Sequence, residues 1–329
     1  MAQTLRYIRI RLHSRRMDAL DGLLEGPRAR GAFLLRSIME PPWCLRIQDQ
    51  APLTLVGLVR GEAWVLPDLG DAVRLQPGDV ALLRGPDAYT VADDPATPPS
   101  VVIHPGQRCT TPDGRDLAQA MDLGVRTWGN DLHGSTVMVI GTYQQQTEVG
   151  TRLLAVLPSL VVMPEGSIDA PHVSLLTREL TDDEPGQHVV LDRLLDVLLV
   201  AVLRAWLARS ASDAPAWYRA RSDPVVGPAL RLLQNSPAHP WTVATLAAAT
   251  HVSRAALARR FSALVGEPPM AFLASWRMAL AADLLRGTDA TLAAVAQQVG
   301  YASPFALSAA FKRRRGLSPR QHRLRPATR

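Results

Sequence analysis

Arginines and alanines share the outer faces of a helix that the sequence predicts over residues 254–264. Ser253 is a good N-cap, and Leu257 and Phe261 fall together on one apolar face. A guanidinium can donate two hydrogen bonds to O6 and N7 of guanine, and a methyl group can contact thymine. We therefore expect Arg259 to contact a base. The neighbouring positions would contact thymine methyl groups (Ala255 and Ala256) or phosphates (Arg254 and Arg260). Ser253 at the start of the helix also belongs to the predicted DNA-binding residues.

A second segment with the same layout lies at residues 303–315. Ser303 is again a good N-cap, Pro304 suits the first position of a helix, and Leu307 and Phe311 form the apolar stripe. The remaining faces of this helix hold few hydrogen-bond donors. It is therefore expected to dock by shape and phosphate contacts and to read few bases, through Ser303, Pro304, Phe305, Ser308 and Lys312.

Each of these two predicted helices follows a short helix and a tight turn. Residues 242–250 precede the first and residues 291–299 precede the second, and a longer helix at 270–286 lies between the two units. A further helix is predicted at 224–234, ahead of both units. A short helix that braces a second helix in the major groove is the helix-turn-helix arrangement. Two such units on one rigid spacer could enter successive major grooves on one face of DNA, roughly 34 Å apart.

Many positions across both units carry a shared pattern: Ala247, Ser253, Leu257, Arg259, Phe261, 266–269, Phe272, Arg277, Ala281, Leu284, Leu285, Val295, Ala296, Gly300, Tyr301, Ser303, Phe311, Lys312, 316–319 and Arg323. With this spacing, residues 225–325 resemble the AraC/XylS family of bacterial transcription regulators. The resemblance implies a pair of helix-turn-helix units that bind double-stranded DNA.

The charge of the chain is unevenly distributed. The net charge is +6 at pH 7, but residues 223–329 hold 14 basic and four acidic side chains, a balance of +10, so the preceding residues carry −4. A basic carboxyl-terminal third on an acidic body is typical of a polyanion-binding module joined to a part with another role.

Short apolar runs separated by turn residues predict strands in the amino-terminal half. The runs lie at 32–38, 53–59, 63–66, 80–83 and 100–103, with a further one at 136–143. Many short strands at near-regular spacing indicate a β-sandwich or barrel. Residues 30–43, 61–64, 75–83 and 163–166 resemble the cupin fold found in the sensor domains of the same family, over roughly residues 20–170.

The cupin-like half lacks the residues with which enzymatic cupins hold a metal. No histidine stands in the run before Gly61, and Tyr89 stands where a later histidine ligand would fall. We therefore expect a binding cup with no cofactor and no metal. Trp43, Trp64 and Tyr89 are candidate lining residues for a small effector, although aromatic residues in a small barrel also serve as core.

Cys44 and Cys109 are the two cysteines of the chain, and both fall in the cupin-like half. Two cysteines exclude a disulfide-rich scaffold. Two accessible thiols of low pKa could form a redox switch that responds to an oxidant, which is an alternative to small-ligand sensing. A cupin enzyme fused to a DNA-binding domain is a second alternative, and it would need a metal site that the sequence does not show.

Two helices are predicted between the halves, at 173–181 and 189–209. The second is apolar over more than one face, so it is either a core helix or an oligomer interface, and we favour a homodimer interface. Residues 210–224 suggest a linker. The expected organisation is a basic extension without fixed structure at 1–16, a cupin-like sensor domain at 17–170, a helical dimerisation segment with its linker at 171–222, and a DNA-binding domain at 223–329.

Together these features predict an α+β multidomain fold and a cytoplasmic, nucleoid-associated transcription regulator that is not an enzyme. No run approaches the roughly 18 apolar residues of a membrane helix, and no secretory pattern opens the chain. The expected partners are double-stranded DNA, a small-molecule effector or an oxidant, a second copy of the chain, and RNA polymerase. Activation and repression remain equally open.

Overall fold

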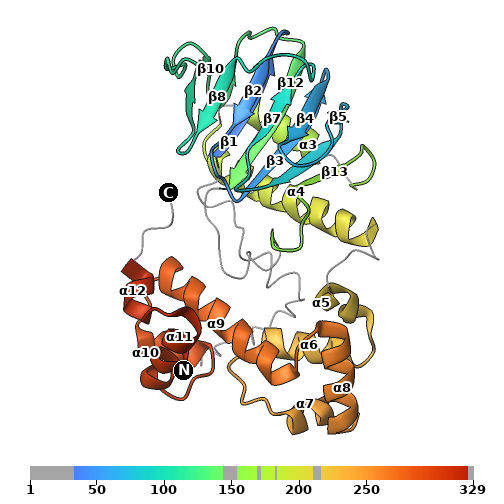
Figure 1. Ribbon diagram of the computed structural model, residues 1–329, viewed down its shortest axis with the longest axis vertical. Helices are drawn as coiled ribbons and strands as arrows, with labels where there is room; N and C mark the ends of the chain where they lie inside the picture. The colour runs from blue at the N-terminus through green and yellow to red at the C-terminus, as the bar shows by residue number, and fades with distance from the viewer. Residues whose placement is uncertain (1–32, 144–153, 169–171, 182–183, 210–215, 325–329) are drawn as a thin grey trace, which may run out of the picture.

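The computed structural model describes residues 33–143, 154–168, 172–181, 184–209 and 216–324. Figure 1 shows that the first half of the chain forms a β-rich part and the last third a helical part. The predicted basic extension at residues 1–16 lies outside the described residues.

The β-rich part consists of two sheets (Figure 1). The first sheet has the order β10 (Asp122–Gly124), β11 (Thr127–Gly129), β1 (Phe33–Met39), β12 (Thr136–Tyr143), β3 (Leu53–Arg60), β6 (Val80–Arg84) and β13 (Leu160–Met163). The second has the order β5 (Val73–Leu75), β4 (Ala63–Pro67), β7 (Tyr89–Ala92), β2 (Cys44–Ile47), β8 (Val101–His104) and β9 (Arg108–Thr110). This two-sheet arrangement confirms the predicted cupin-like fold.

All six strands that the sequence predicted are present, as β1, β3, β4, β6, β8 and β12. The strands that the sequence missed have only three or four residues each: β2, β5, β7, β9, β10, β11 and β13. A segment that short shows little alternation of apolar and polar side chains, and β8, which has four residues and was predicted, was found through its continuous apolar run at 100–103.

The central strands of the first sheet, β12, β3 and β6, are buried on both faces. On β12, Met138 packs between the two sheets, whereas Val139 and Tyr143 belong to a second core that includes α3 (His172–Thr181) and α4 (Gln187–Arg209). Successive side chains of a strand point to opposite faces, so a strand covered on both sides reads as a continuous apolar run. This explains why the sequence of β12 shows no polar side.

One side of α4 forms part of the core on the first sheet (Figure 1). Its leucines at 191, 195, 198, 199, 203 and 207 are fully buried, whereas Val189, Val190 and Val197 are exposed. The apolar residues of α4 therefore fall into two groups, one that packs in the core and one that faces outward. Neither α4 nor any other helix in the described part of the chain is long and apolar enough to cross a membrane.

The helical part confirms all six predicted helices. They are α6 (Val226–Asn235), α7 (Val243–Ala249), α8 (Arg254–Val265), α9 (Pro269–Gly287), α10 (Leu292–Gln298) and α11 (Pro304–Arg315); α12 (Pro319–Leu324) was not predicted. The central helix α9 takes part in two cores. Phe272 and Trp276 pack with α6, α7 and α8, whereas Ala281 and Leu285 pack with α10 and α11.

Within the predicted linker at 210–224, residues 216–222 are helical. They form α5 (Ala216–Arg219) and a 3-10 turn at Ala220–Ser222, and residues 210–215 lie outside the described residues. Ala220 is fully buried in the core of the first helix-turn-helix unit, and α5 contacts α8. Packing against α8 therefore orders a segment whose composition suggested a linker.

Candidate nucleic-acid interface and ligand cavity

The first predicted recognition helix, α8, has an apolar side and an open side. The Ser253 hydroxyl accepts a hydrogen bond from the Ala256 N–H at 3.2 Å and so caps the helix. Leu257 and Phe261 are fully buried in the core of the first unit. Ala256 is half-buried, whereas Ser253, Arg254, Ala255, Arg259 and Arg260 are exposed.

The second recognition helix, α11, repeats this construction. The Ser303 hydroxyl accepts a hydrogen bond from the Ala306 N–H at 3.1 Å, and Leu307 and Phe311 are fully buried. Of the predicted contact residues, Phe305 is 86% exposed and Lys312 is exposed, whereas Ser303, Pro304 and Ser308 are half-buried. The open side of α11 thus combines one large apolar side chain with basic ones.

The turns of the two units have the same backbone geometry. In the first, His251 has φ 57° and the Val252 N–H donates to the Ala247 carbonyl at 3.1 Å. In the second, Gly300 has φ 79° and the Tyr301 N–H donates to the Ala296 carbonyl at 2.8 Å. The chain therefore contains two copies of one helix-turn-helix unit, as the sequence predicted.

One loop connects the two units physically. A methyl group on Gly300 would lie 2.7 Å from the Cα atom of Ala238, so the second turn touches the loop between α6 and α7 of the first unit. Arg277 on α9 holds the same loop, since its guanidinium donates to the carbonyls of Pro237 at 2.7 Å and His239 at 2.8 Å. These contacts fix the relative placement of the two units.

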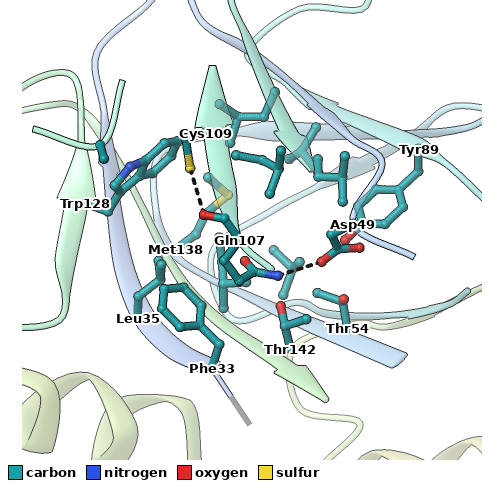
Figure 2. Close-up of a pocket in the computed structure, with 17 residues that line it drawn as sticks. Phe33, Leu35, Asp49, Thr54, Tyr89, Gln107, Cys109, Trp128, Met138 and Thr142 are labelled. Atoms are coloured by element: carbon teal, nitrogen blue, oxygen red, sulfur yellow. Dashed lines mark hydrogen bonds between the residues drawn. The ribbon is translucent and has the colours of Figure 1, made fainter. Parts of the chain in front are cut away.

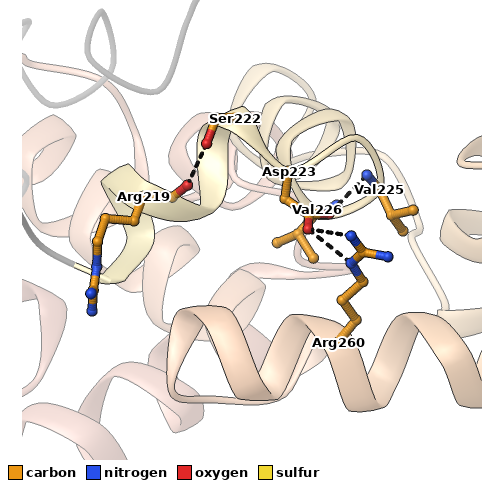
Figure 3. Close-up of polar contacts among 6 residues, drawn as sticks. All are labelled: Arg219, Ser222, Asp223, Val225, Val226 and Arg260. Atoms are coloured by element: carbon orange, nitrogen blue, oxygen red, sulfur yellow. Dashed lines mark hydrogen bonds and ion pairs between the residues drawn. The ribbon is translucent and has the colours of Figure 1, made fainter. Parts of the chain in front are cut away.

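Arg260 on α8 has a partner within the chain (Figure 3). Its Nε and Nη2 atoms each lie 2.8 Å from Oδ2 of Asp223, while Oδ1 of Asp223 accepts the N–H groups of Val225 and Val226. The sequence predicted a phosphate contact for Arg260 and gave no sign of this pair, because the two residues are far apart in the chain. A phosphate would have to compete with Asp223.

A cavity of about 190 Å³ lies between the two sheets (Figure 2). Both sheets contribute inward-facing apolar side chains to its wall. Those from the first sheet include Leu35 of β1, Val56 of β3 and Met138 of β12, and those from the second include Ile47 of β2 and Val91 of β7. The polar lining residues are Asp49, Thr54, Tyr89, Gln107, Cys109 and Thr142. This mixture of an apolar wall and a few polar groups is typical of a small-molecule site.

The candidate lining residues divide into one that lines the cavity and two that do not. Tyr89 lines the cavity, and burial raises the pKa of its hydroxyl, against a hydrogen bond with Thr54 that lowers it. The structure does not place Trp43 or Trp64 in the wall of the cavity. Trp43 is instead fully buried in the core. The sequence missed Phe33 and Trp128, because Trp128 reaches the wall only through the pairing of β11 with β1.

The structure contradicts a redox switch that joins Cys44 to Cys109. Ile47 on the strand of Cys44 pairs with Ile103, and Ile103 pairs with Cys109, so Cys109 lies two strand spacings away from Ile47. Cys44 lies three residues before Ile47 along its own strand. Together these two offsets place the Cα atoms of Cys44 and Cys109 about 14 Å apart. A disulfide needs less than about 7 Å. Cys109 lines the cavity, whereas Cys44 is an odd number of residues from Ile47 and faces the other side of the sheet.

The thiols are also poorly suited to rapid oxidation. Burial raises the pKa of Cys109 to about 11, and the Asp116 carboxylate adds to the shift. Burial raises the pKa of Cys44 as well, with a further contribution from Asp93. Over the described ranges, no three histidine, cysteine or acidic side chains come together as possible metal ligands.

Comparison with known proteins matches both parts of the chain. A family model described as a cupin matches residues 18–208, and one described as a helix-turn-helix domain matches residues 246–325. The DNA-binding domain of AdpA, a global transcriptional factor solved in complex with a target DNA, is 35% identical, covers 31% of this chain and 91% of that one, and has a TM-score of 0.29.

Two relatives extend over nearly the whole chain. A protein of Streptomyces antibioticus that carries the name AraC-like transcription regulator is 35% identical and covers 94% of this chain and 99% of its own length. A protein of the same name from Streptomyces lividans is 34% identical with the same coverage. With the two helix-turn-helix units and the cupin-like sheets described above, the chain belongs to the AraC-like family of DNA-binding transcription regulators.

Proposed function

We propose that this regulator reads two successive major grooves of one DNA face with α8 and α11. The observation that carries the proposal is the contact of Gly300 and Arg277 with the loop at 237–239, which holds the two units in one arrangement. The spacer α9 has 19 residues and is therefore about 28 Å long. This length is comparable with the roughly 34 Å between successive major grooves.

The two helices have different roles in this proposal. Arg259 reads a base from α8, with methyl contacts from Ala255 and Ala256 and a phosphate contact from Arg254. Helix α11 docks through Phe305 and through phosphate contacts from Lys312, Ser303 and Ser308. Arg260 exchanges between Asp223 and a phosphate, since the carboxylate already occupies its guanidinium in the free protein.

The cavity holds a small effector, and β12 couples it to α4. Ile140 and Thr142 line the cavity, whereas a methyl group on the intervening Gly141 would collide with Leu195 of α4. The Tyr143 hydroxyl donates to the Leu195 carbonyl at 3.3 Å. An effector that prefers one position of β12 would therefore shift α4, because a ligand acts through its differential affinity for two states.

The exposed side of α4 is the proposed homodimer interface. Val189, Val190 and Val197 are all exposed there. A shift of α4 would then change the spacing of the two DNA-binding modules across the dimer, and with it the access of RNA polymerase to the promoter. Val197→Asp should convert the dimer to a monomer in analytical ultracentrifugation, whereas Val125→Asp, at an exposed valine next to β11, should leave it unchanged. A monomeric wild-type protein would contradict the interface.

DNA footprinting tests the two-groove arrangement. Protection should fall in two patches on one face of the duplex, about one helical turn apart. Gel shifts in rising salt should show a steep loss of affinity, since each neutralised phosphate contributes about −0.9 to the slope of log K against log salt. A single protected patch, or affinity that does not respond to salt, would contradict the proposal. The protein would act in the cytoplasm, on the nucleoid, and carry out no catalysis.

A further inference from the structure

The size of the cavity limits what it can hold. At about 190 Å³ it is slightly larger than the roughly 150 Å³ of an engineered apolar cavity that binds benzene. One aromatic ring with a short substituent therefore fills it. The wall suits such a ring, because Phe33, Tyr89 and Trp128 can make edge or stacking contacts and Met138 can place its sulfur against a ring.

Asp49, Thr54 and Thr142 gather toward one end of the cavity, whereas Cys109 lies near Trp128 toward the opposite side (Figure 2). Asp49 is only 8% exposed; its Oδ1 accepts the Ala51 N–H at 3.1 Å and its Oδ2 accepts from Gln107 Nε2 at 2.9 Å. Two carboxylate oxygens offer about four acceptor positions, so Asp49 can accept a further hydrogen bond.

The backbone at this end is held in an uncommon conformation. Gln50 and Gln107 have φ values of 57° and 62°, a left-handed region that is unfavourable for a residue other than glycine. Gln50 follows Asp49 directly, and Gln107 is the residue that donates to the Asp49 carboxylate. Strain that clusters around a ligand-facing carboxylate indicates a constructed binding site.

The charge of the wall determines which ligands it accepts. Of the described residues that line the cavity, none is a lysine, arginine or histidine, and Asp49 is the one carboxylic acid. A ligand carboxylate or phosphate would bring a second negative charge into an apolar space without a positive partner, which is strongly unfavourable. A hydroxyl or ammonium group would instead donate to Asp49.

We propose that this cavity binds a compact aromatic molecule that carries a hydroxyl or amino group and that it rejects organic anions. The ring lies against Trp128 and Phe33, and the polar group donates to the Asp49 carboxylate. This inference rests on the proposed function in one respect, which is that the cavity is the site where the effector binds.

Three probes that share one ring test the ligand class. Benzyl alcohol, benzylamine and benzoate are titrated into the full-length protein and followed by saturation-transfer NMR. The alcohol and the amine should bind at least tenfold more tightly than benzoate. Asp49→Asn, which keeps an acceptor for the Ala51 N–H, should reduce the preference for the amine over benzoate at least tenfold. Benzoate binding as tightly as the alcohol, or no binding of any probe, would overturn the proposal.

Two substitutions on β8 locate the binding. Ile103 lines the cavity, whereas Val102 is its neighbour on the same strand and does not. Ile103→Phe should abolish binding of all probes, and Val102→Phe should leave it unchanged, with circular dichroism confirming that both variants are folded. An equal loss in both variants would overturn the assignment to the cavity, and so would probe binding that survives in folded Ile103→Phe.

Gel shifts with and without the probes separate this inference from the proposed function. If the alcohol binds in the cavity and DNA affinity does not change, the effector role fails while the ligand class stands. If benzoate changes DNA affinity through the cavity and the alcohol does not, the ligand class fails while the effector role stands.

Discussion

Asp223 and Arg260 join the start of α6 to the outer side of α8. Both Nε and Nη2 of Arg260 lie 2.8 Å from Oδ2 of Asp223, and Oδ1 accepts the N–H groups of Val225 at 2.9 Å and Val226 at 2.8 Å. One carboxylate therefore caps a helix and also holds an arginine of the first recognition helix (Figure 3). The segment that leads out of α5 is thereby tied directly to α8.

Removing the Asp223 carboxylate should destabilise the helical part. Asp223→Ala should lower the free energy of unfolding by about 1–2 kcal/mol, as for other helix caps. Arg260→Ala, which leaves the cap intact, should cost less. Urea unfolding at pH 7 measures both, and equal costs in the two variants would mean that the cap contributes nothing.

The effect of Asp223 should depend on pH. Burial alone would raise the pKa of Asp223, but the N–H groups of Val226 and Val225 and the Arg260 guanidinium hold it below its usual value. A carboxyl group with a lowered pKa in the folded state stabilises the fold above its unfolded pKa, about 3.9, and loses that contribution as the pH falls through the folded pKa. The difference between wild type and Asp223→Ala should therefore shrink below about pH 4, and a difference that grows in acid would contradict this.

Arg259 and Lys312 should affect DNA binding in different ways. Arg259→Ala should reduce affinity for the preferred site by about 1–3 kcal/mol and relax the preference at one base pair. Lys312→Ala should weaken binding to all sequences alike and lower the salt slope by about 1. Gel shifts on the preferred site and on a set of single-base variants measure both effects. Uniform weakening by Arg259→Ala would rule out its role as a base reader.

Gly300→Ala should disturb the relation between the two helix-turn-helix units. The new methyl group would meet the Ala238 Cα at 2.7 Å, and the φ of 79° disfavours any side chain. We expect weaker binding to the two-groove site, with binding to a half-site for α8 retained. His251→Gly is the matched control, because it occupies the same position in the first turn at φ 57° and should be nearly neutral. Equal losses on the full site and the half-site would indicate general unfolding.

Gly141 permits the close approach of β12 and α4. A methyl group there would lie 2.4 Å from Cδ1 of Leu195, so Gly141→Ala should cost about 1–3 kcal/mol of stability through overpacking. In the double variant with Leu195→Ala this added cost should largely disappear, which thermal unfolding of all four proteins can show as a coupling. Additive effects would mean that the two residues do not press on each other.

Cys109 should react slowly with thiol reagents near neutral pH. With a pKa of about 11, almost all of it is protonated at pH 7.5, and its alkylation should accelerate about tenfold per pH unit up to about pH 10. Mass spectrometry after pulses of iodoacetamide measures the rate for each cysteine. Mapping of oxidised monomer should find no Cys44–Cys109 linkage, and a linked pair of peptides would contradict the arrangement of the strands.

The sequence by itself determined the DNA-binding part almost completely. The caps Ser253 and Ser303, the apolar stripes that include Phe261 and Phe311, and the helical spacer all follow from residues within one or two turns of each other, so their signals survive in a short window of sequence. The same holds for the longer strands, such as β3 and β12. Helix α12 and the helical residues 216–222 were missed, since each is short and depends on packing.

Tertiary structure alone decided the contents of the cavity and the pairs that hold the parts together. Trp128 reaches the wall because Arg36 pairs with Thr127 between strands about ninety residues apart, and Trp43 is excluded by burial in the core. The same holds for the opposite faces of Cys44 and Cys109, for Asp223 beside Arg260, and for Gly300 against Ala238. A residue's type and its chain neighbours fix its local conformation, but strand pairing and helix packing join distant segments, and no local pattern records which segments meet.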